Sequence, residues 1–309
     1  MKKISIISTS YNEVKNIENC YETIKASFEN KDLEYEHIFS DNHSDDGTIE
    51  KLKEISKKDK KVKVIINKRN YGPFLNNFNA LKFATGDYII VNFPSDMQDP
   101  VITMHEMIKK IDDGYDAIFS IKKDIKEKFI IKKIRNLFYF LLKKFGNNKI
   151  IQNSNEFICI SKNLQKEVIN TNDYNPFIRA RVQRLSTKPG FVYFIRECRD
   201  KGESKNSLFS LYKQATNAFI STMDTAIHVI SFTSIVISLG LLLLLIYTFI
   251  TKIFFPNIAP HGIATLIILI SFGFSCLFVF LSIILEYLYS INNQVRFNEK
   301  VTVDEKINF

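Results

Sequence analysis

The stretch GDYIIVNFPSDMQDP, from Gly86 to Pro100, joins an apolar run to a polar loop. Residues 87–93 have the β-branched and aromatic composition of a buried strand. The loop after them holds two acids, Asp96 and Asp99, and the amide of Gln98. In open α/β sheets, ligands bind beyond the carboxyl ends of the strands. This stretch therefore indicates both the fold class and the place of a site.

Strand and helix patterns alternate around that stretch. The expected strands are 3–9, 35–41, 62–68 and 87–93, and the expected helices are 16–29, 48–59 and 74–86, the last stopped by Gly86. Alternation at this spacing predicts an α/β domain built on a parallel sheet.

Polar clusters follow three of the expected strands. SYNE (10–13) follows the first, DNHSDDGT (41–48) the second and PSDMQDP (94–100) the fourth. Since carboxyl ends of parallel strands meet at one sheet edge, the clusters predict a shared site there. The alternative is that each cluster only caps a helix, which applies most to Ser44–Asp46 because a helix begins there.

The composition favours an anionic partner. Of 309 residues, 46% are hydrophobic, and 42 Lys and Arg against 33 Asp and Glu give a net charge of +9. Nucleic acid, a nucleotide sugar and an anionic membrane surface all fit this charge. The basic residues are spread along the chain without a nucleic-acid motif, which disfavours nucleic acid. The four cysteines lie far apart without CxxC spacing, as reduced thiols do.

Two uncharged apolar runs, Val229–Ile250 and Ile263–Leu285, stand near the end of the chain. Each has about 22 residues, roughly 33 Å of helix, which is enough to cross a bilayer core. We expect a transmembrane hairpin over residues 228–289; a buried helical hairpin in a soluble core is the alternative. Lysines and arginines flank the pair on both sides, so the positive-inside bias predicts that both termini are cytoplasmic.

Two segments have the pattern of helices that lie on a membrane surface. Residues 126–146 place apolar side chains along one side and basic ones on most of the rest, although a helix packed on the sheet would also fit. Residues 206–227 are a similar interfacial candidate just before the first apolar run. The expected plan is a cytosolic domain (1–205), this interfacial segment, the hairpin and a cytosolic tail (290–309), in the inner membrane of a bacterium.

Five segments together carry a resemblance: YNE (11–13), DNHSDDGT (41–48), NYGPFLNNFNALKFATGDYI (70–89), SDMQDP (95–100) and RDKGESK (199–205). They resemble family 2 glycosyltransferases of the polyisoprenyl-phosphate type, which include dolichyl-phosphate mannose synthase and bactoprenol glucosyltransferases. The likeness covers nearly the whole chain, including the hairpin. It implies a nucleotide-sugar-binding, GT-A-type Rossmann-like domain followed by the membrane hairpin.

The resemblance also implies roles for single residues on the donor side. Thr9, Tyr11 and Glu13 would border the nucleotide, and Asp41 would recognise its base. Ser95 would belong to the same binding set.

A divalent cation is implied as well. Asp96 and Gln98 would ligate Mg²⁺ or Mn²⁺, which prefer oxygen ligands. The family often has Asp-x-Asp at this loop, whereas Pro94 stands at the place of the first acid here. We expect one carboxylate and the donor diphosphate to hold the metal, with Pro94 fixing the loop.

On the acceptor side, Arg199 and Lys205 are expected to hold a lipid phosphate. The alternative is that these two residues only contribute to the positive charge that is usual on the cytoplasmic side of a membrane span. Arg179 is a further candidate. In NSNEFICIS (153–161), Glu156 keeps a carboxylate where the family more often has an Asp-Phe-Arg stretch.

The expected function is inverting transfer of a sugar from a nucleotide sugar, a UDP-sugar by preference, to a polyprenyl phosphate for surface-glycan assembly or modification. A phosphate is already anionic, so it needs no general base, and no strong base candidate stands out. Two alternatives stay open: transfer to a hydroxyl of a surface glycan, and a catalytically degenerate nucleotide-sugar-binding module. Because paired membrane spans often associate, a homo-oligomer is a further expectation.

Overall fold

The computed structural model describes residues 2–29, 33–123, 133, 151, 154–170, 177–195, 243, 250, 254, 262–296 and 301–309. These residues belong to two compact units. The first contains the sheet and its covering helices, together with the last residues of the chain. The second contains helix α10 (Gly262–Arg296).

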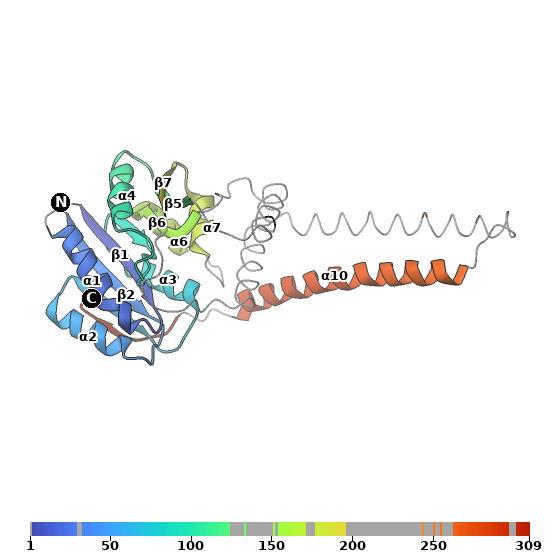
Figure 1. The fold of residues 1–309 in the computed structure, drawn as a ribbon, viewed down its shortest axis with the longest axis horizontal. Coiled ribbons are helices and arrows are strands. Elements are labelled where there is room, and N and C mark those ends of the chain that lie inside the picture. Colours follow the sequence, from blue (N-terminus) through green and yellow to red (C-terminus); the bar gives the residue numbers. More distant parts are fainter. Residues whose placement is uncertain are drawn as a thin grey trace. The chain divides into compact units, whose positions relative to one another are not determined.

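The expected alternation of strands and helices is confirmed in the first half of the chain (Figure 1). The elements are β1 (Lys3–Ser10), α1 (Val14–Phe28), β2 (Glu34–Asp41), α2 (Thr48–Lys58), β3 (Val62–Asn67), α3 (Pro73–Leu81), β4 (Tyr88–Val91) and α4 (Ile102–Asp112). They continue as β5 (Ala117–Lys123), β6 (Ser154–Ser161), α6 (Lys162–Asn170), α7 (Ile178–Leu185), β7 (Pro189–Ile195) and β8 (Val303–Ile307).

The sheet is mixed, so the predicted parallel arrangement is confirmed for its four central strands and wrong for the sheet as a whole. Its strand order is β7-β5-β6-β4-β1-β2-β3-β8. The central strands β4, β1, β2 and β3 run parallel, as the alternating pattern requires. Strand β6 is antiparallel to β4, and β8 is antiparallel to β3. Both antiparallel strands come from later in the chain, and strand periodicity does not determine the direction of such a remote pairing.

Helices cover the sheet on both faces, which explains why its central strands are almost wholly buried. In β1, Ile4 and Ile6 pack into one core cluster with residues of α1, α2 and α4. Ile7 points to the other face, into a cluster with residues of α3, α6 and α7. Alternate residues of a strand face opposite sides, so β1 supplies both cores.

Helix α3 ends at Leu81, five residues before the glycine that was expected to stop it. Gly86 has another role, which is a close approach to β1. A Cβ atom at Gly86 would lie 2.7 Å from the backbone nitrogen of Ser5 and 2.8 Å from the carbonyl oxygen of Lys3. The Gly86 N–H also donates to Ser5 Oγ over 2.8 Å.

Gly86→Ala is expected to lower the free energy of unfolding by about 1–3 kcal/mol, because the added methyl group forces backbone apart in a packed core. The measurement is the melting temperature of the detergent-purified full chain. An unchanged melting temperature would contradict the close approach of Gly86 to β1.

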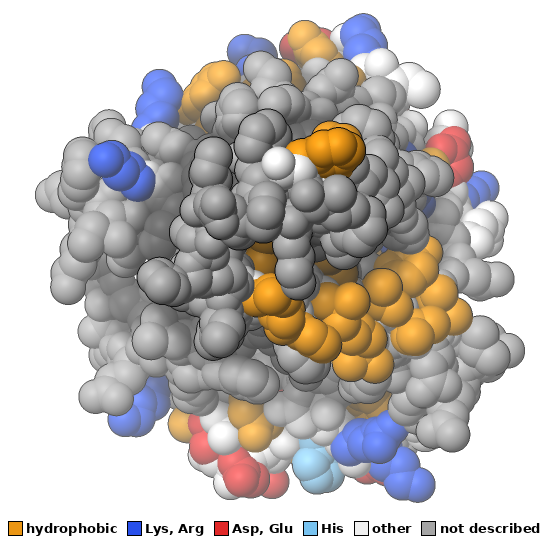
Figure 2. Space-filling model, turned by 90° about the vertical axis from the view of Figure 1, so that its right-hand side faces the viewer, with side chains coloured by type: hydrophobic (Ala, Val, Ile, Leu, Met, Phe, Trp, Pro, Cys, Tyr) orange, Lys and Arg blue, Asp and Glu red, His pale blue; other side chains and the backbone are white. Residues whose placement is uncertain are grey.

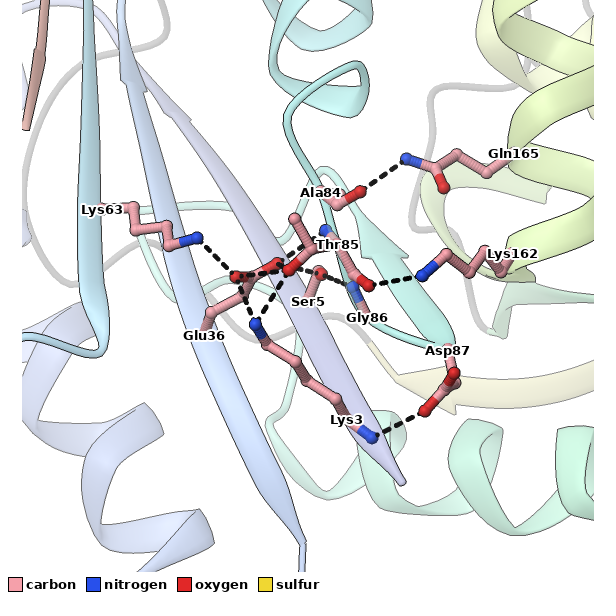
Figure 3. Close-up of polar contacts among 10 residues, drawn as sticks. All are labelled: Lys3, Ser5, Glu36, Lys63, Ala84, Thr85, Gly86, Asp87, Lys162 and Gln165. Carbon is pink, nitrogen blue, oxygen red and sulfur yellow. Dashed lines mark hydrogen bonds and ion pairs between the residues drawn. The ribbon is translucent and has the colours of Figure 1, made fainter. Parts of the chain in front are cut away.

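A buried carboxylate connects the turn that contains Thr85 and Gly86 to three strands near their amino ends (Figure 3). Glu36 in β2 is only 2% exposed. It accepts hydrogen bonds from Ser5 Oγ (2.5 Å) and the Thr85 N–H (2.7 Å). Its Oε2 lies 3.0 Å from Lys3 Nζ and 2.9 Å from Lys63 Nζ. One side chain therefore joins the starts of β1, β2 and β3 to the turn before β4.

The second unit presents a helix with many exposed apolar side chains. Hydrophobic side chains gather on the face that is turned to the viewer in Figure 2. Those of α10 that are exposed include Leu266, Ile270, Phe272, Phe274, Leu277, Val279, Leu281, Ile284, Leu285 and Leu288. Counting only the residues that the structure describes, no helix is identified as long and apolar enough to cross a membrane. The transmembrane hairpin and its location stay predictions.

Several predicted features lie outside the described residues. These are residues 206–227, the segment 126–146 except Lys133, and the run 229–250 except Leu243 and Ile250. The C-terminal tail brings a finding that the sequence did not suggest: α10 continues to Arg296, and residues 303–307 form the eighth strand of the sheet.

Candidate functional site

The three polar clusters lie at one edge of the sheet, as expected, because β4, β1 and β2 are neighbours that run in the same direction. Their loops also carry unusual backbone. Of the five non-glycine residues with positive φ in the described chain, four follow these strands: Asn12, His43, Asn92 and Met97. Such conformations are costly and cluster at functional sites, so the edge is the candidate site.

Asp41 lies under the loop that follows β2 rather than on its surface. Its side chain is fully buried, and Oδ1 accepts hydrogen bonds from Ser10 Oγ (3.0 Å) and Ser44 Oγ (2.6 Å). Oδ2 accepts from the Ser44 N–H over 2.8 Å. Burial raises the pKa of the Asp41 carboxyl, and the hydrogen bonds from Ser44 and Ser10 oppose the rise. Asp41 thus shapes the loop that was expected to receive the base.

The SYNE and DNHSDDGT loops are joined by hydrogen bonds. Ser44 Oγ accepts from the Asn12 N–H over 2.9 Å, and Asn12 Oδ1 accepts from the Asp45 N–H over 3.1 Å. Thr48 Oγ1 accepts from the Glu13 N–H over 3.0 Å. Tyr11 projects beside them with 41% of its surface exposed. Tyr11 and Glu13 therefore border the site, held in place by the neighbouring loop.

The loop after β4 is fixed to the end of β1. Thr9 Oγ1 donates to Asn92 Oδ1 over 3.0 Å. Ser95 is buried, and its Oγ donates to the carbonyl oxygen of Thr9 over 3.1 Å. Thr9 and Ser95 thus connect the two strand ends, and Asp96 follows directly.

Asp96 and Gln98 place oxygen atoms that suit a divalent cation on one short turn after β4. Both are part-exposed, and the Gln98 N–H lies 3.4 Å from Asp96 Oδ1, so the two side chains begin from the same short turn. Their oxygen atoms are the ligands that Mg²⁺ and Mn²⁺ prefer. No group of three or more His, Cys, Asp or Glu suited to a metal occurs in the described part of the chain.

Further polar side chains lie beside this loop, because β6 begins where β4 ends. Asn155 Nδ2 donates to Asp99 Oδ2 over 2.5 Å. Glu156 Oε1 lies 3.6 Å from Nε of Arg179 in α7. Burial raises the pKa of the Glu156 carboxyl, and the Arg179 guanidinium opposes that rise. Glu156 and Arg179, separate candidates in the sequence, form one ion pair.

A fourth loop at the site, the one between β3 and α3, was not assigned to it from the sequence. Asn42, next to Asp41, donates from Nδ2 to Asn70 Oδ1 over 2.7 Å and accepts the Tyr71 N–H at Oδ1 over 3.0 Å. Asn70 Oδ1 also accepts the Gly72 N–H over 2.8 Å. The signal was the NYG sequence (70–72), whose Gly72 has φ 83°. The resemblance includes this segment but implies no role for it.

Arg199 and Lys205 lie outside the described residues, so their role as phosphate ligands stays a prediction. The site as described therefore consists of the loops that follow β1, β2, β3 and β4, together with the Glu156–Arg179 pair.

Asp41→Asn is expected to lower the free energy of unfolding by about 1–3 kcal/mol. The amide NH₂ group would face one of the buried donors that now bond to the carboxylate, so that this donor would lose its acceptor. It is also expected to weaken nucleotide binding about tenfold or more, because the loop at the site loses its anchor. Melting temperature and nucleotide titration measure the two effects. Asp45→Asn, in an exposed position of the same loop, is the matched control and should change neither. Equal results for both variants would remove the anchoring role of Asp41.

Comparison with known proteins then identifies the family. The sequence model described as Glycosyl transferase family 2 matches residues 5–169, more than half of the chain. The chain belongs to glycosyl transferase family 2. The matched range runs from Ser5 in β1 past β6, and it includes the strand ends that carry Asp41, Asp96 and Gln98. The resemblance to this family that the sequence suggested is confirmed.

Relatives match over nearly the full length. The chain is 27% identical over 294 residues to the glycosyltransferase YkcC of Bacillus subtilis, covering 94% of this chain and 90% of that protein. It is 22% identical over 303 residues to the undecaprenyl-phosphate 4-deoxy-4-formamido-L-arabinose transferase of Klebsiella pneumoniae, covering 96% and 91%. The chain is therefore similar to both proteins along almost its whole length, beyond the matched family 2 range.

A solved structure shows the same fold. Glucosyl-3-phosphoglycerate synthase from Mycobacterium tuberculosis, in complex with Mn²⁺, UDP-glucose and phosphoglyceric acid, is similar with a TM-score of 0.51. Identity is 14%, and the match covers 71% of this chain and 78% of that chain. The family 2 domain described above therefore has a GT-A-like α/β fold.

Proposed function

We propose that the protein is a membrane-bound, inverting glycosyltransferase that moves a sugar from a nucleotide sugar, preferably a UDP-sugar, to a polyprenyl phosphate. The observation that carries the proposal is the meeting of three strand ends, with Asp41 under one loop and Asp96 and Gln98 on another. The acceptor named for the Klebsiella relative and the donor bound by the Mycobacterium neighbour support the two substrate classes. The lipid product would serve surface-glycan assembly or modification.

The reaction asks for little acid–base chemistry from the chain. The acceptor phosphate is already anionic, so its oxygen attacks the anomeric carbon without giving a proton to a side chain. The bond from that carbon to the nucleotide diphosphate breaks on the opposite face, and the configuration inverts. A divalent cation at Asp96 and Gln98 would offset the negative charge of the departing diphosphate.

The other side chains have binding roles in this proposal. Thr9, Ser95, Tyr11 and Glu13 border the nucleotide, and Asp41 holds the loop against which the base lies. Arg199 and Lys205 neutralise the acceptor phosphate where the chain approaches the membrane.

Membrane attachment in the proposal rests on the two apolar runs and on the exposed apolar side chains of α10. The sheet adds a constraint. Strands β7 and β8 belong to the same sheet, although β7 ends at Ile195 and β8 begins at Val303. Any passage of the intervening chain through a bilayer must therefore return, and the number of crossings must be even. A hairpin of two spans meets this constraint, with the catalytic domain and both termini on the cytoplasmic side of a bacterial inner membrane.

The test uses the full chain in detergent with radiolabelled nucleotide sugars and undecaprenyl phosphate. Undecaprenol, which offers a hydroxyl in place of the phosphate, is the matched acceptor. Each reaction is run with Mn²⁺, with Mg²⁺ and with EDTA, and label in the organic phase is counted. We expect metal-dependent product with the phosphate acceptor alone.

Other outcomes assign other functions. If product forms with undecaprenol, or only with glycan acceptors, the acceptor group is a hydroxyl and not a phosphate. Metal-dependent nucleotide binding without transfer to any acceptor would indicate a binding module that has lost catalysis.

A further inference from the structure

The last strand of the chain is firmly attached to the sheet. Strand β8 pairs with β3 from Val64↔Ile307 to Asn67↔Val303, and Ile307 and Val303 pack against the two opposite core clusters. Asn308 closes the strand, since its Nδ2 donates to the carbonyl oxygens of Ser56 (2.7 Å) and Val62 (2.8 Å). Strand β8 is thus held at its C-terminal end by Asn308 and on both faces by the two core clusters.

The N-terminal end of β8 lies against the loop between β3 and α3. The carbonyl oxygen of Thr302 accepts the Lys68 N–H over 3.0 Å. The Thr302 N–H donates to the hydroxyl oxygen of Tyr71 over 3.2 Å. The register of the pair also shifts between Ile66 and Asn67, where β3 gives way to this loop. Thr302 therefore holds the loop at two points, one on its backbone and one on a side chain.

Tyr71 connects the C-terminal strand to the candidate site. Its hydroxyl oxygen accepts from Thr302, while its own N–H donates to Asn42 Oδ1 over 3.0 Å. Asn42 is 3% exposed, directly follows Asp41, and donates its N–H to the carbonyl oxygen of Ser10 over 3.0 Å. A continuous set of hydrogen bonds thus runs from Thr302 to the ends of β1 and β2.

We propose that the C-terminal strand is a positioning element of the nucleotide site, with Thr302 and Tyr71 as the positioning residues. Thr302 holds the Tyr71 side chain, and Tyr71 holds the loop 68–72 against Asn42. The loop is then set in place before the nucleotide arrives, which lowers the cost of binding. This inference rests on the proposed function, since it assigns the nucleotide to the edge formed by β1, β2 and β4.

Removing either partner of the Thr302–Tyr71 hydrogen bond tests the inference in the full chain. Tyr71→Phe deletes the acceptor, and Thr302→Pro deletes the N–H donor. We expect each to weaken UDP or GDP binding, measured with Mn²⁺, about three- to tenfold, the range that one lost hydrogen bond allows. In the double variant the losses should not add, because both changes remove the same contact.

Two control variants separate positioning from general damage. Tyr88→Phe removes a hydroxyl that contacts Lys2 Nζ (2.8 Å) and Asp112 Oδ1 (2.7 Å) near the amino ends of the strands, and should leave nucleotide affinity unchanged. Val301→Pro places a proline one residue earlier and keeps the Thr302 N–H. It should also leave affinity unchanged.

A readout without ligand keeps this test independent of the proposed function. Hydrogen exchange of the Tyr71 and Gly72 amides should be faster in Tyr71→Phe and Thr302→Pro than in wild type. Wild-type protein that binds neither UDP nor GDP would overturn the proposed function. Wild-type binding with unchanged affinity and exchange in both variants, or fully additive losses, would overturn the positioning role alone.

Discussion

We expect Glu36→Gln to lower the free energy of unfolding by about 3 kcal/mol, because two lysine side chains would lose the buried negative charge that they contact. The Lys3 and Lys63 ammonium groups lie within 3.0 Å of Glu36 Oε2. Burial alone would raise the pKa of Glu36, but hydrogen bonds from Ser5, Lys63, Thr85 and Lys3 lower it to about 2. A carboxyl whose pKa falls on folding contributes stability in its ionised form.

The sign of the pH dependence follows directly. The contribution of Glu36 is complete above its pKa in the unfolded chain, about 4.5, and is lost as pH falls toward about 2. The difference in melting temperature between wild type and Glu36→Gln should therefore be constant above about pH 5 and should shrink below it. Glu34→Gln, at the exposed start of the same strand, is the matched control with no expected change. A difference that is independent of pH would mean that Glu36 is not ionised in the folded protein.

Asp96→Asn is expected to lower the rate of sugar transfer at least about a hundredfold, because the loss of the metal ligand that we propose here removes several kcal/mol of charge stabilisation at the departing diphosphate. Initial rates of organic-soluble product measure the effect. Asparagine keeps the size of the side chain, so the melting temperature should stay within a few degrees of wild type. Asp113→Asn changes an exposed carboxylate after α4 and should leave the rate unchanged.

A manganese titration gives the same prediction a second readout. The concentration of Mn²⁺ that half-saturates nucleotide binding should rise about tenfold or more in Asp96→Asn. A rate within threefold of wild type, with an unchanged Mn²⁺ requirement, would show that Asp96 is not a metal ligand. Gln98 and substrate oxygens would then have to hold the cation.

Local sequence patterns were enough to predict the centre of the sheet and the edge that carries the site. The strands β1, β2 and β4 are short segments with β-branched or aromatic residues, and each is followed by a polar cluster. Their parallel order follows from the helices between them, since parallel strands need crossover connections. The gathering of Thr9, Asp41 and Asp96 at one edge follows from that order.

Contacts between remote parts of the chain could not be predicted in the same way. Strand β8 carries Val303 and Ile307, whose spacing suits a strand, but nothing local selects β3 as its partner. The helix pattern before Gly86 also gave no sign that this glycine lies against β1 rather than ending α3. The Glu156–Arg179 pair likewise depends on how α7 lies beside β6. These features are set by tertiary packing, which periodicity does not contain.

The position of β8 also determines when the sheet can be completed during protein synthesis. Roughly 240 residues separate the end of β3 from β8, so at about 5–20 residues per second the edge of β3 is without its partner for roughly 10–50 s on the ribosome. An open strand edge is a template for pairing with another chain. Two nascent copies on one messenger both expose this edge until β8 pairs with β3, so they can exchange their β8 strands for as long as that pairing is not made.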